Sequence, residues 1–294
     1  MPDDHIALLK SAFDQYVSLL FHESAEPLDP SGHYLAYEFD FLCNRKWHML
    51  GEMMVACDLR ELTNLVNRWK SLLHRWHAWN RVAASYDEDQ AWELHHEFLE
   101  ALAHDCLTRP SSMRDAITAV ATNSLHQVRC ALGNGYADRL DGDPSTPDSP
   151  HQHLSRAKKE KRLANIASIW SESKSFLAVL RSLDDASYRQ QTSDYRNLTN
   201  HAIGPRLGVG ITRTVTRVVI QATRMQEDAD GSCREVEIPG QMAVCYGFGG
   251  TEPLDYEGAR LANLEQFLRA RDCYVKFMEL LQSAVNSIPS VDGG

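Results

Sequence analysis

A long stripe of apolar residues at helical spacing most constrains what this chain can fold into. Residues 34–81 contain no proline, and apolar side chains recur there every three or four positions. They are Leu42, Met49, Met53, Ala56, Leu59, Leu62, Leu65, Trp69, Leu72 and Trp76. This spacing lines one face of a helix, and such a face has to be buried against other elements. The stretch therefore predicts one long helix, or two helices with a bend at Gly51.

The remainder of residues 1–137 is also predicted to be helical. Residues 6–20 carry apolar side chains at helical spacing. Acidic residues 87–89 suit the first turn of a helix that reaches about Leu107. Pro110-Ser111-Ser112 is expected to start another helix, which ends near Gly133-Asn134-Gly135. Residues 1–137 thus form a predicted N-terminal helical region.

Residues 138–150, DRLDGDPSTPDSP, are rich in Pro, Asp and Ser and predict a linker or exposed loop. A second helical region, 151–294, begins at the basic run RAKKEKR (156–162), which is typical of a solvated helix face. It continues with a helix over about 184–203 and another from about Tyr256. The two helical regions can form separate domains or a single one.

The residue composition changes between these last two helices. ITRTVTRVVIQATR (211–224) is β-branched, and CREVEIPGQMAVCYGF (233–248) can pair with it across the turn EDADGS (227–232). The predicted fold class is therefore all-α, a helical bundle with a small β-hairpin-like insertion around 210–248.

The bulk properties exclude several classes of protein. The net charge of −10 argues against nucleic-acid affinity over the whole surface, although a local basic cleft is compatible with it. The chain has no 18-residue apolar run and its first residues do not resemble a signal peptide, so we expect a cytoplasmic protein without a membrane contact. The seven cysteines are scattered without a CxxC pair, which is typical of reduced core thiols.

Two histidine-rich stretches offer ligand-binding alternatives. Glu93 and His96 form a single ExxH, but a di-iron bundle needs that motif twice, so His95, His96 and His104 are expected to be an exposed helix face. The stretch RWKSLLHRWHAWN (68–80) could line a haem or small-molecule pocket. We favour a bundle core for its large aromatic rings. No metal or other cofactor is expected.

The stretch DYRNLTNHAI (194–203) is the most informative one. On a helical wheel, Tyr195, Leu198 and Ala202 share one face. The remaining positions form one unbroken polar arc, made of Arg196, Asn197, Asn200 and His201. Asn197 and His201 are i,i+4 neighbours, so the amide is expected to orient the imidazole. Gly204-Pro205 should end the helix just beyond His201.

An arginine beside a histidine suits phosphodiester chemistry. A guanidinium binds phosphate oxygens and stabilises charge that builds on phosphorus. A histidine can move protons to or from ribose hydroxyls near neutral pH. Because attack by the 2′-hydroxyl needs both a base and an acid, and the stretch has one histidine, we expect a two-fold homodimer that brings two copies together.

RNLTNH (196–201) resembles the Arg-polar-xxx-His signature of the HEPN superfamily, helical domains of which many are metal-independent endoribonucleases in toxin–antitoxin and defence systems. The resemblance implies that Arg196 and His201 are catalytic and that Asn197 supports them. It also implies RNA as a partner, a homodimer, and an inhibitor or antitoxin protein as a further partner. Asn200, Arg206, Arg213 and Arg217 are predicted to contact RNA, with Arg213 and Arg217 on one side of a strand. The alternatives are a non-catalytic helical interaction or RNA-binding protein, and a haem- or small-molecule-binding bundle.

Overall fold

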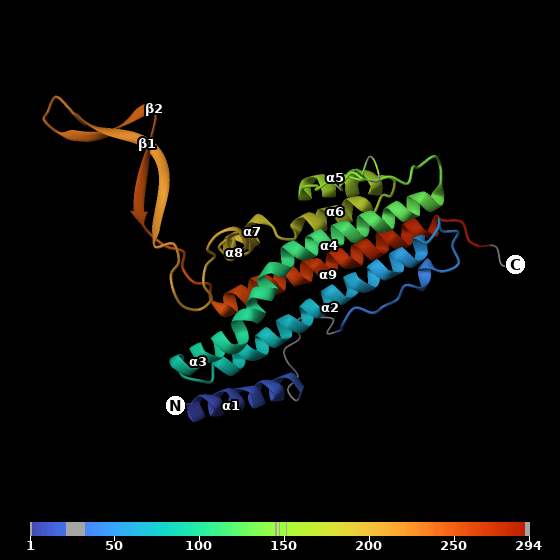
Figure 1. Ribbon diagram of the computed structural model, residues 1–294, viewed down its shortest axis with the longest axis horizontal. Coiled ribbons are helices and arrows are strands. Elements are labelled where there is room, and N and C mark those ends of the chain that lie inside the picture. Colours follow the sequence, from blue (N-terminus) through green and yellow to red (C-terminus); the bar gives the residue numbers. More distant parts are fainter. Residues whose placement is uncertain (1, 22–32, 145, 147, 151, 292–294) are drawn as a thin grey trace. The chain divides into compact units, whose positions relative to one another are not determined.

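A computed structural model describes residues 2–21, 33–144, 146, 148–150 and 152–291 of the chain (Figure 1). The chain is mostly helical and carries one two-stranded antiparallel sheet, which confirms the predicted mainly helical fold with a late hairpin. It divides into two compact units. The first comprises residues 1–192 and 256–294, and the second comprises residues 193–255. The helical regions on both sides of the 138–150 loop therefore belong to one unit.

Helices make up the first unit. Their bounds are α1 Pro2–Phe21, α2 Gly51–Ala83, α3 Glu88–Leu94, α4 Glu100–Leu132, α5 Arg156–Ala167, α6 Ser173–Ser182, α7 Ala186–Gln191 and α9 Tyr256–Asn286. A 3-10 turn covers Asp40–Leu42, and a π-helical turn at His95–Leu99 joins α3 to α4. Among the described helices, none is both long enough and apolar enough to cross a bilayer.

The three longest helices, α2, α4 and α9, lie side by side and enclose the core (Figure 1). Trp69 and Trp76 of α2 have no exposed surface, and Phe267 and Phe277 of α9 have almost none. The rings of Trp69 and Phe267 meet edge to face, with centroids 5.7 Å apart. Rings in this arrangement stabilise a core beyond the area that they bury. The apolar stripe of residues 59–76 is thus the contact face that its spacing predicts.

The start of that stripe was predicted wrongly. Helix α2 begins at Gly51, so Gly51 is a helix start and not a bend. Residues 33–39, ahead of the 3-10 turn, form no helix, and the backbone N–H and C=O of Leu35 bond to the side-chain amide of Asn67 in α2 at 2.8 and 3.0 Å. Met49 has a left-handed φ of 48° and is 84% exposed. A side-chain amide that satisfies the backbone of an extended segment removes the need for a helix there.

Pro110 does not start a helix, contrary to the sequence prediction, because α4 runs through it without interruption. A proline inside a helix leaves the carbonyl four residues earlier without its N–H partner. That carbonyl belongs to Cys106, and it accepts a bond of 2.7 Å from the side chain of Asn263 in α9. The packed neighbour therefore supplies the donor that the proline lacks.

The helix predicted over 184–203 is interrupted. Helix α7 ends at Gln191 and α8 covers Tyr195–His201, and both Ser193 and Asp194 between them have left-handed φ values, 49° and 52°. No α-helix continues through two such residues, because the left-handed conformation breaks the i→i−4 ladder. The end of the predicted helix near His201 is correct.

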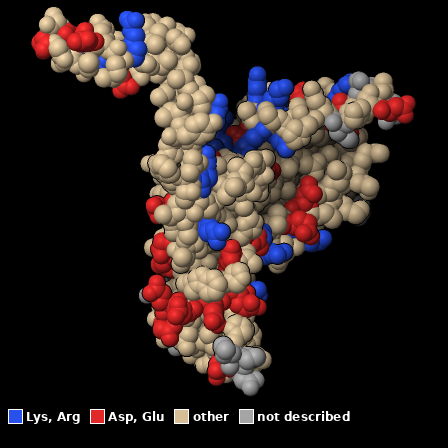
Figure 2. Space-filling view, turned by 60° about the vertical axis from the view of Figure 1, so that its left-hand side comes forward, with Lys and Arg blue, Asp and Glu red and all other residues tan. Residues whose placement is uncertain are grey.

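The second unit contains α8 and the hairpin. Strand β1 (Val215–Glu227) pairs with β2 (Cys233–Phe248) in antiparallel register, and the turn lies at 228–232, as predicted. The register shifts between Gln221 and Thr223, opposite Pro239 and Gly240, and Gly240 has a φ of 75°. Such a bulge bends and twists a two-stranded ribbon. Figure 2 shows the hairpin as largely uncharged surface with charged side chains near its tip.

The loop 138–150 has no helix or strand in its described residues, as predicted. The basic run after it opens α5, and its residues divide between two roles. Lys158 and Lys161 are exposed, whereas Glu160 is buried and accepts two bonds from Arg114, at 2.7 and 3.1 Å. Arg156 bonds to Asp115 and Asp184. The run is therefore partly an anchor of α5 and partly a solvated face.

Candidate functional site

Helix α8 carries the arginine, asparagines and histidine of the sequence motif in a single helix of seven residues. The helical wheel predicted a core face of Tyr195, Leu198 and Ala202. Tyr195 is buried as predicted, but Leu198 is only half-buried and Ala202 is exposed beyond the end of α8. The guanidinium of Arg196 donates to Asn197 Oδ1 at 3.0 Å, and Asn197 Nδ2 donates to Asp194 Oδ1 at 2.8 Å. These two hydrogen bonds hold the guanidinium of Arg196 in place, because the Asn197 amide that accepts from it is itself bonded to Asp194.

Asn197 was expected to orient the imidazole of His201, but its amide bonds to Arg196 and Asp194. His201 is the last residue of α8 and its side chain is exposed. Within the described residues, the imidazole makes no hydrogen bond or ion pair. The exposed imidazole of His201 is thus accessible to an incoming ligand.

The chain turns tightly after His201. Thr199 Oγ1 donates to the Tyr195 carbonyl at 2.6 Å, and Gly204 folds back against the same hydroxyl. A Cβ atom at position 204 would lie 2.5 Å from Thr199 Oγ1, so only glycine fits there. This turn ends α8 and leaves the imidazole of His201 at the C-terminal end of the helix.

The residues predicted to contact RNA lie in the same unit. Asn200 is exposed on α8. Arg206 follows the turn, and its backbone carbonyl accepts from Leu254 N–H at 2.8 Å. Arg217 lies in β1, but Arg213 precedes the strand and has a left-handed φ of 57°. The predicted alternation that placed Arg213 and Arg217 on one side of a strand is therefore wrong.

Aromatic residues that the motif analysis did not single out accompany Arg217. The register pairs Arg217 with Tyr246 and Val215 with Phe248, so both aromatic rings lie on the same face of the hairpin as Arg217. Tyr246 is 68% exposed and Phe248 is 97% exposed. Exposed aromatic rings beside an arginine form a surface on which nucleic-acid bases can stack. The sequence does contain a signal for this surface, because Tyr246 and Phe248 are two positions apart and side chains two apart share one face of a strand.

The tryptophan-rich segment of α2 is packed, which favours its interpretation as core. The ring of Trp79 stacks on Tyr16 and on Phe98, with centroids 4.4 Å apart in both pairs. Trp69 and Trp76 of the same segment have no exposed surface. Burial, followed by the charge of Lys70, lowers the pKa of His74.

Among the residues that the structure describes, the single ExxH does not gather a ligand set. Glu93 bonds to His5 at 2.8 Å, and His96 bonds to Glu100 at 3.1 Å. His96 also stacks on Trp92, which is 54% exposed. Figure 2 shows acidic side chains gathered over part of the surface of the first unit. The ExxH residues are thus engaged in pairs on the helix surface.

A different group of potential metal ligands meets at the C-terminal end of α4. His126 Nε2 lies 2.8 Å from Asp138 Oδ1 and 3.7 Å from Cys130 Sγ. Donor atoms of these three residues all lie within 4.8 Å of one another. Burial first, and then the charge and hydrogen bond of the Asp138 carboxylate, together raise the pKa of the Cys130 thiol to about 11. Sequence analysis missed this group, although His126 and Cys130 show the i,i+4 spacing of helical ligand pairs.

The cysteines are less uniformly buried than predicted. Cys106 and Cys273 are core residues and Cys130 is half-buried, but Cys43, Cys57, Cys233 and Cys245 are exposed. The prediction of core thiols therefore fails for these four exposed residues.

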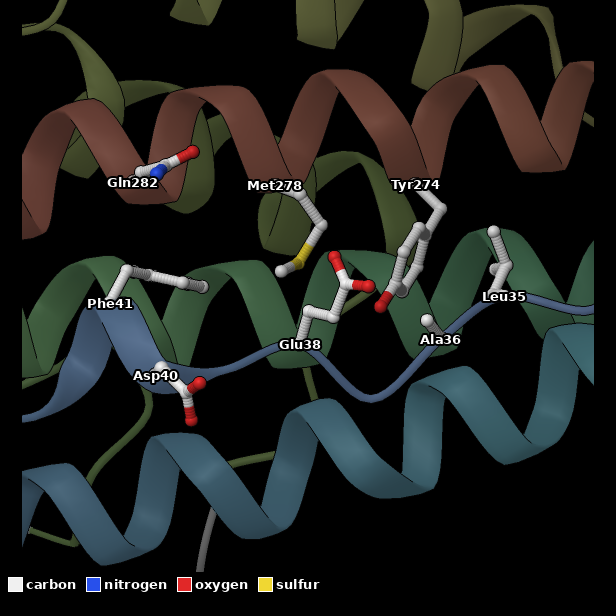
Figure 3. Close-up of a pocket in the computed structure, with 8 residues that line it drawn as sticks. All are labelled: Leu35, Ala36, Glu38, Asp40, Phe41, Tyr274, Met278 and Gln282. Carbon is white, nitrogen blue, oxygen red and sulfur yellow. The ribbon is translucent and has the colours of Figure 1, made fainter.

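The first unit has a hollow of about 430 Å³ between residues 35–41 and α9. Figure 3 shows the Glu38 carboxylate extending between Met278 and Tyr274. The Tyr274 hydroxyl is engaged with Thr63 Oγ1 at 2.8 Å. The lining residues are Leu35, Ala36, Glu38, Asp40, Phe41, Tyr274, Met278 and Gln282. This described lining contains no histidine or cysteine, and its titratable side chains are Glu38, Asp40 and Tyr274.

Comparisons with family models, with curated proteins and with solved structures find no match to this chain.

Proposed function

We propose that the chain is a metal-independent endoribonuclease that cleaves single-stranded RNA at α8. The observation that carries the proposal is the exposed imidazole of His201 on the same short helix as Arg196, whose guanidinium is held by Asn197. The resemblance of RNLTNH to the HEPN signature supports the same assignment. The proposal includes a role for the protein as a toxin or defence effector.

The proposed reaction is an internal transfer at phosphorus. The ribose 2′-oxygen bonds to the adjacent phosphorus as the bond from phosphorus to the 5′-oxygen breaks. A base takes the proton from the 2′-hydroxyl, and an acid gives a proton to the leaving 5′-oxygen. The products are a 2′,3′-cyclic phosphate and a 5′-hydroxyl. DNA lacks the attacking hydroxyl and should not be cleaved.

Arg196 and His201 have distinct roles in this scheme. His201 carries a proton, and its exposure allows it to reach a ribose hydroxyl. Arg196 faces the phosphate oxygens and stabilises the charge that they gain in the transition state. Asn197 positions Arg196 through the bond between its Oδ1 and the guanidinium.

The test is cleavage of single-stranded RNA in EDTA by the full chain and its variants. We expect His201→Ala to reduce the cleavage rate about 10²–10⁴-fold. Arg196→Ala should reduce it about 10²–10³-fold, as loss of one charge-stabilising group usually does. His48→Ala is the matched control, because His48 is also an exposed histidine. It should cleave like the unsubstituted protein.

Thermal unfolding separates catalysis from a structural role. Exposed positions usually change the free energy of unfolding by less than about 0.5 kcal/mol, so His201→Ala should melt like the parent chain. Lost cleavage with an unchanged melting temperature supports the proposal. Cleavage that survives both substitutions refutes it, and RNA binding without cleavage in the parent chain would favour the non-catalytic alternative.

A further inference from the structure

Three side chains with different ligand atoms converge where α4 ends. His126 and Cys130 are one turn apart on the same face of α4, and Asp138 approaches from the following loop. His126 is 4% exposed, whereas Asp138 is 63% exposed. A buried imidazole therefore faces a thiol and a solvent-accessible carboxylate.

Local backbone geometry brings the loop back to the helix. Gly133, Asn134 and Gly135 have φ values of 70°, 44° and 72°, and this left-handed run reverses the chain just after Leu132. The Tyr136 N–H then bonds to the Gly133 carbonyl at 2.7 Å. Side chains beyond the reversal are thus placed beside the last turns of α4.

Tyr136 lies where a metal-binding histidine usually has its outer partner. Its hydroxyl is 2.8 Å from His126 Nδ1, and the guanidinium of Arg129 lies over its ring, 4.3 Å from the centroid. A partner on one ring nitrogen fixes the orientation of the imidazole and directs the other nitrogen toward a metal. The other nitrogen, Nε2, is the one that faces Cys130 and Asp138.

We propose that His126, Cys130 and Asp138 bind a single Zn²⁺ ion, with one coordination position left to solvent. Imidazole nitrogen, thiolate sulfur and carboxylate oxygen are all zinc ligands, and sulfur disfavours Mg²⁺ and Ca²⁺. The thiolate and the carboxylate together balance the charge of a divalent ion. Zinc with three protein ligands and an open position is the arrangement of sites that bind water or a substrate.

The distances fit this ion with a small adjustment. Tetrahedral zinc holds its ligand atoms about 3.4 Å apart, from bond lengths of about 2.0–2.3 Å. The 3.7 Å from Nε2 to Cys130 Sγ is close to that separation. The 2.8 Å from Nε2 to Asp138 Oδ1 has to widen by about 0.6 Å, and an exposed loop side chain can move that far. A hydrogen-bonded clamp between His126 and Asp138 is the rival interpretation, but it has no need of Cys130.

The experiment titrates the metal-free full chain with Co²⁺ and then displaces the cobalt with Zn²⁺. We expect one equivalent to bind and to give a thiolate-to-cobalt charge-transfer band with visible ligand-field bands. Cys130→Ser should abolish the charge-transfer band. Tyr136→Phe removes an outer partner of His126 and should weaken Zn²⁺ binding about 10–100-fold. Asp138→Asn removes a ligand and should weaken Zn²⁺ binding at least as much.

Cys57→Ser and Asp141→Asn are the matched controls, because one removes an exposed cysteine outside the cluster and the other an acid in the same loop. Both should bind Co²⁺ like the parent chain, and circular dichroism should show every variant to be folded. Absence of a charge-transfer band in the parent chain, or a band that survives Cys130→Ser, overturns the proposal. The readout is independent of RNA cleavage, so the zinc site and the nuclease can fail separately.

Discussion

Asn263 is a single residue that holds three elements of the core together. It has no exposed surface, its Oδ1 accepts from Trp69 Nε1 at 2.8 Å, and its Nδ2 donates to the Cys106 carbonyl and to the Tyr188 hydroxyl. Asn263→Leu should lower the free energy of unfolding by about 2–4 kcal/mol, because it leaves buried polar groups without partners. Urea denaturation measures this loss.

Pro110→Ala supplies the matched background for this test. An alanine at position 110 has the N–H that the Cys106 carbonyl lacks in the native helix. Asn263→Leu should therefore cost less free energy in the Pro110→Ala chain than in the native one. Equal costs in the two backgrounds would show that the amide does not replace the missing helix bond.

Asp185 gives the stability of the first unit a predictable dependence on pH. Burial raises its pKa, but the Tyr188 N–H and the Arg269 guanidinium outweigh burial and hold the pKa below its usual value. A carboxyl with a lowered pKa stabilises the folded state above its ordinary pKa, and this contribution is lost as the pH falls through the folded value. Asp185→Asn should cost about 0.5–1 kcal/mol at neutral pH, and the difference should vanish in acid.

Urea denaturation at pH 7, 5 and 3 checks this dependence. Asp272→Asn is the control, because the side chain of Asp272 is 53% exposed and its ion pair with Lys276 Nζ is long, at 3.9 Å. The difference between that variant and the parent should stay small at each pH. A cost of Asp185→Asn that does not change between pH 7 and pH 3 would contradict the assignment.

At the scale of elements, the hairpin is the feature most open to a direct test. If it holds single-stranded RNA, Phe248→Ala should weaken binding by about 1–3 kcal/mol, the usual contribution of one stacked base. Arg217→Gln should weaken binding and reduce its dependence on salt, because one phosphate contact is lost. Fluorescence anisotropy with a labelled oligonucleotide at several salt concentrations measures both effects.

Arg224→Gln is the control for the hairpin, because Arg224 is also exposed in β1 but lies beyond the bulge, near the acidic tip. It should leave affinity nearly unchanged. Equal losses for Arg217→Gln and Arg224→Gln would indicate general charge attraction and not a local stacking surface.

At the scale of the whole molecule, the proposed chemistry requires an assembly. The motif supplies one histidine per chain, and a single histidine cannot act as base and acid in the same step. We therefore predict a homodimer in which a two-fold axis brings two copies of His201 into one cleft. Sedimentation should show the dimer at micromolar concentration. Mixing inactive His201→Ala chains with parent chains should lower the activity per parent chain. If the protein were a monomer, the added chains would leave that activity unchanged.

The hairpin and its turn followed from β-branched composition and turn residues, and most of the hairpin's side chains are exposed. Sequence periodicity determined the helices whose apolar faces pack together, because such a helix needs one buried face at a fixed period. The polar arc of α8 followed from the same argument, and it places Arg196 and His201 correctly on one helix.

Only the tertiary structure decided the features that depend on distant partners. Pro110 stays inside α4 because Asn263, 153 positions later, bonds to the freed carbonyl. The segment around Leu35 stays outside any helix because the side-chain amide of Asn67 bonds to its backbone N–H and C=O. His126, Cys130 and Asp138 meet because the chain reverses at Gly133–Gly135. The sequence contains these residues, but local propensity cannot show which side chain will reach a backbone group or ligand atom far along the chain, because that choice is made by packing.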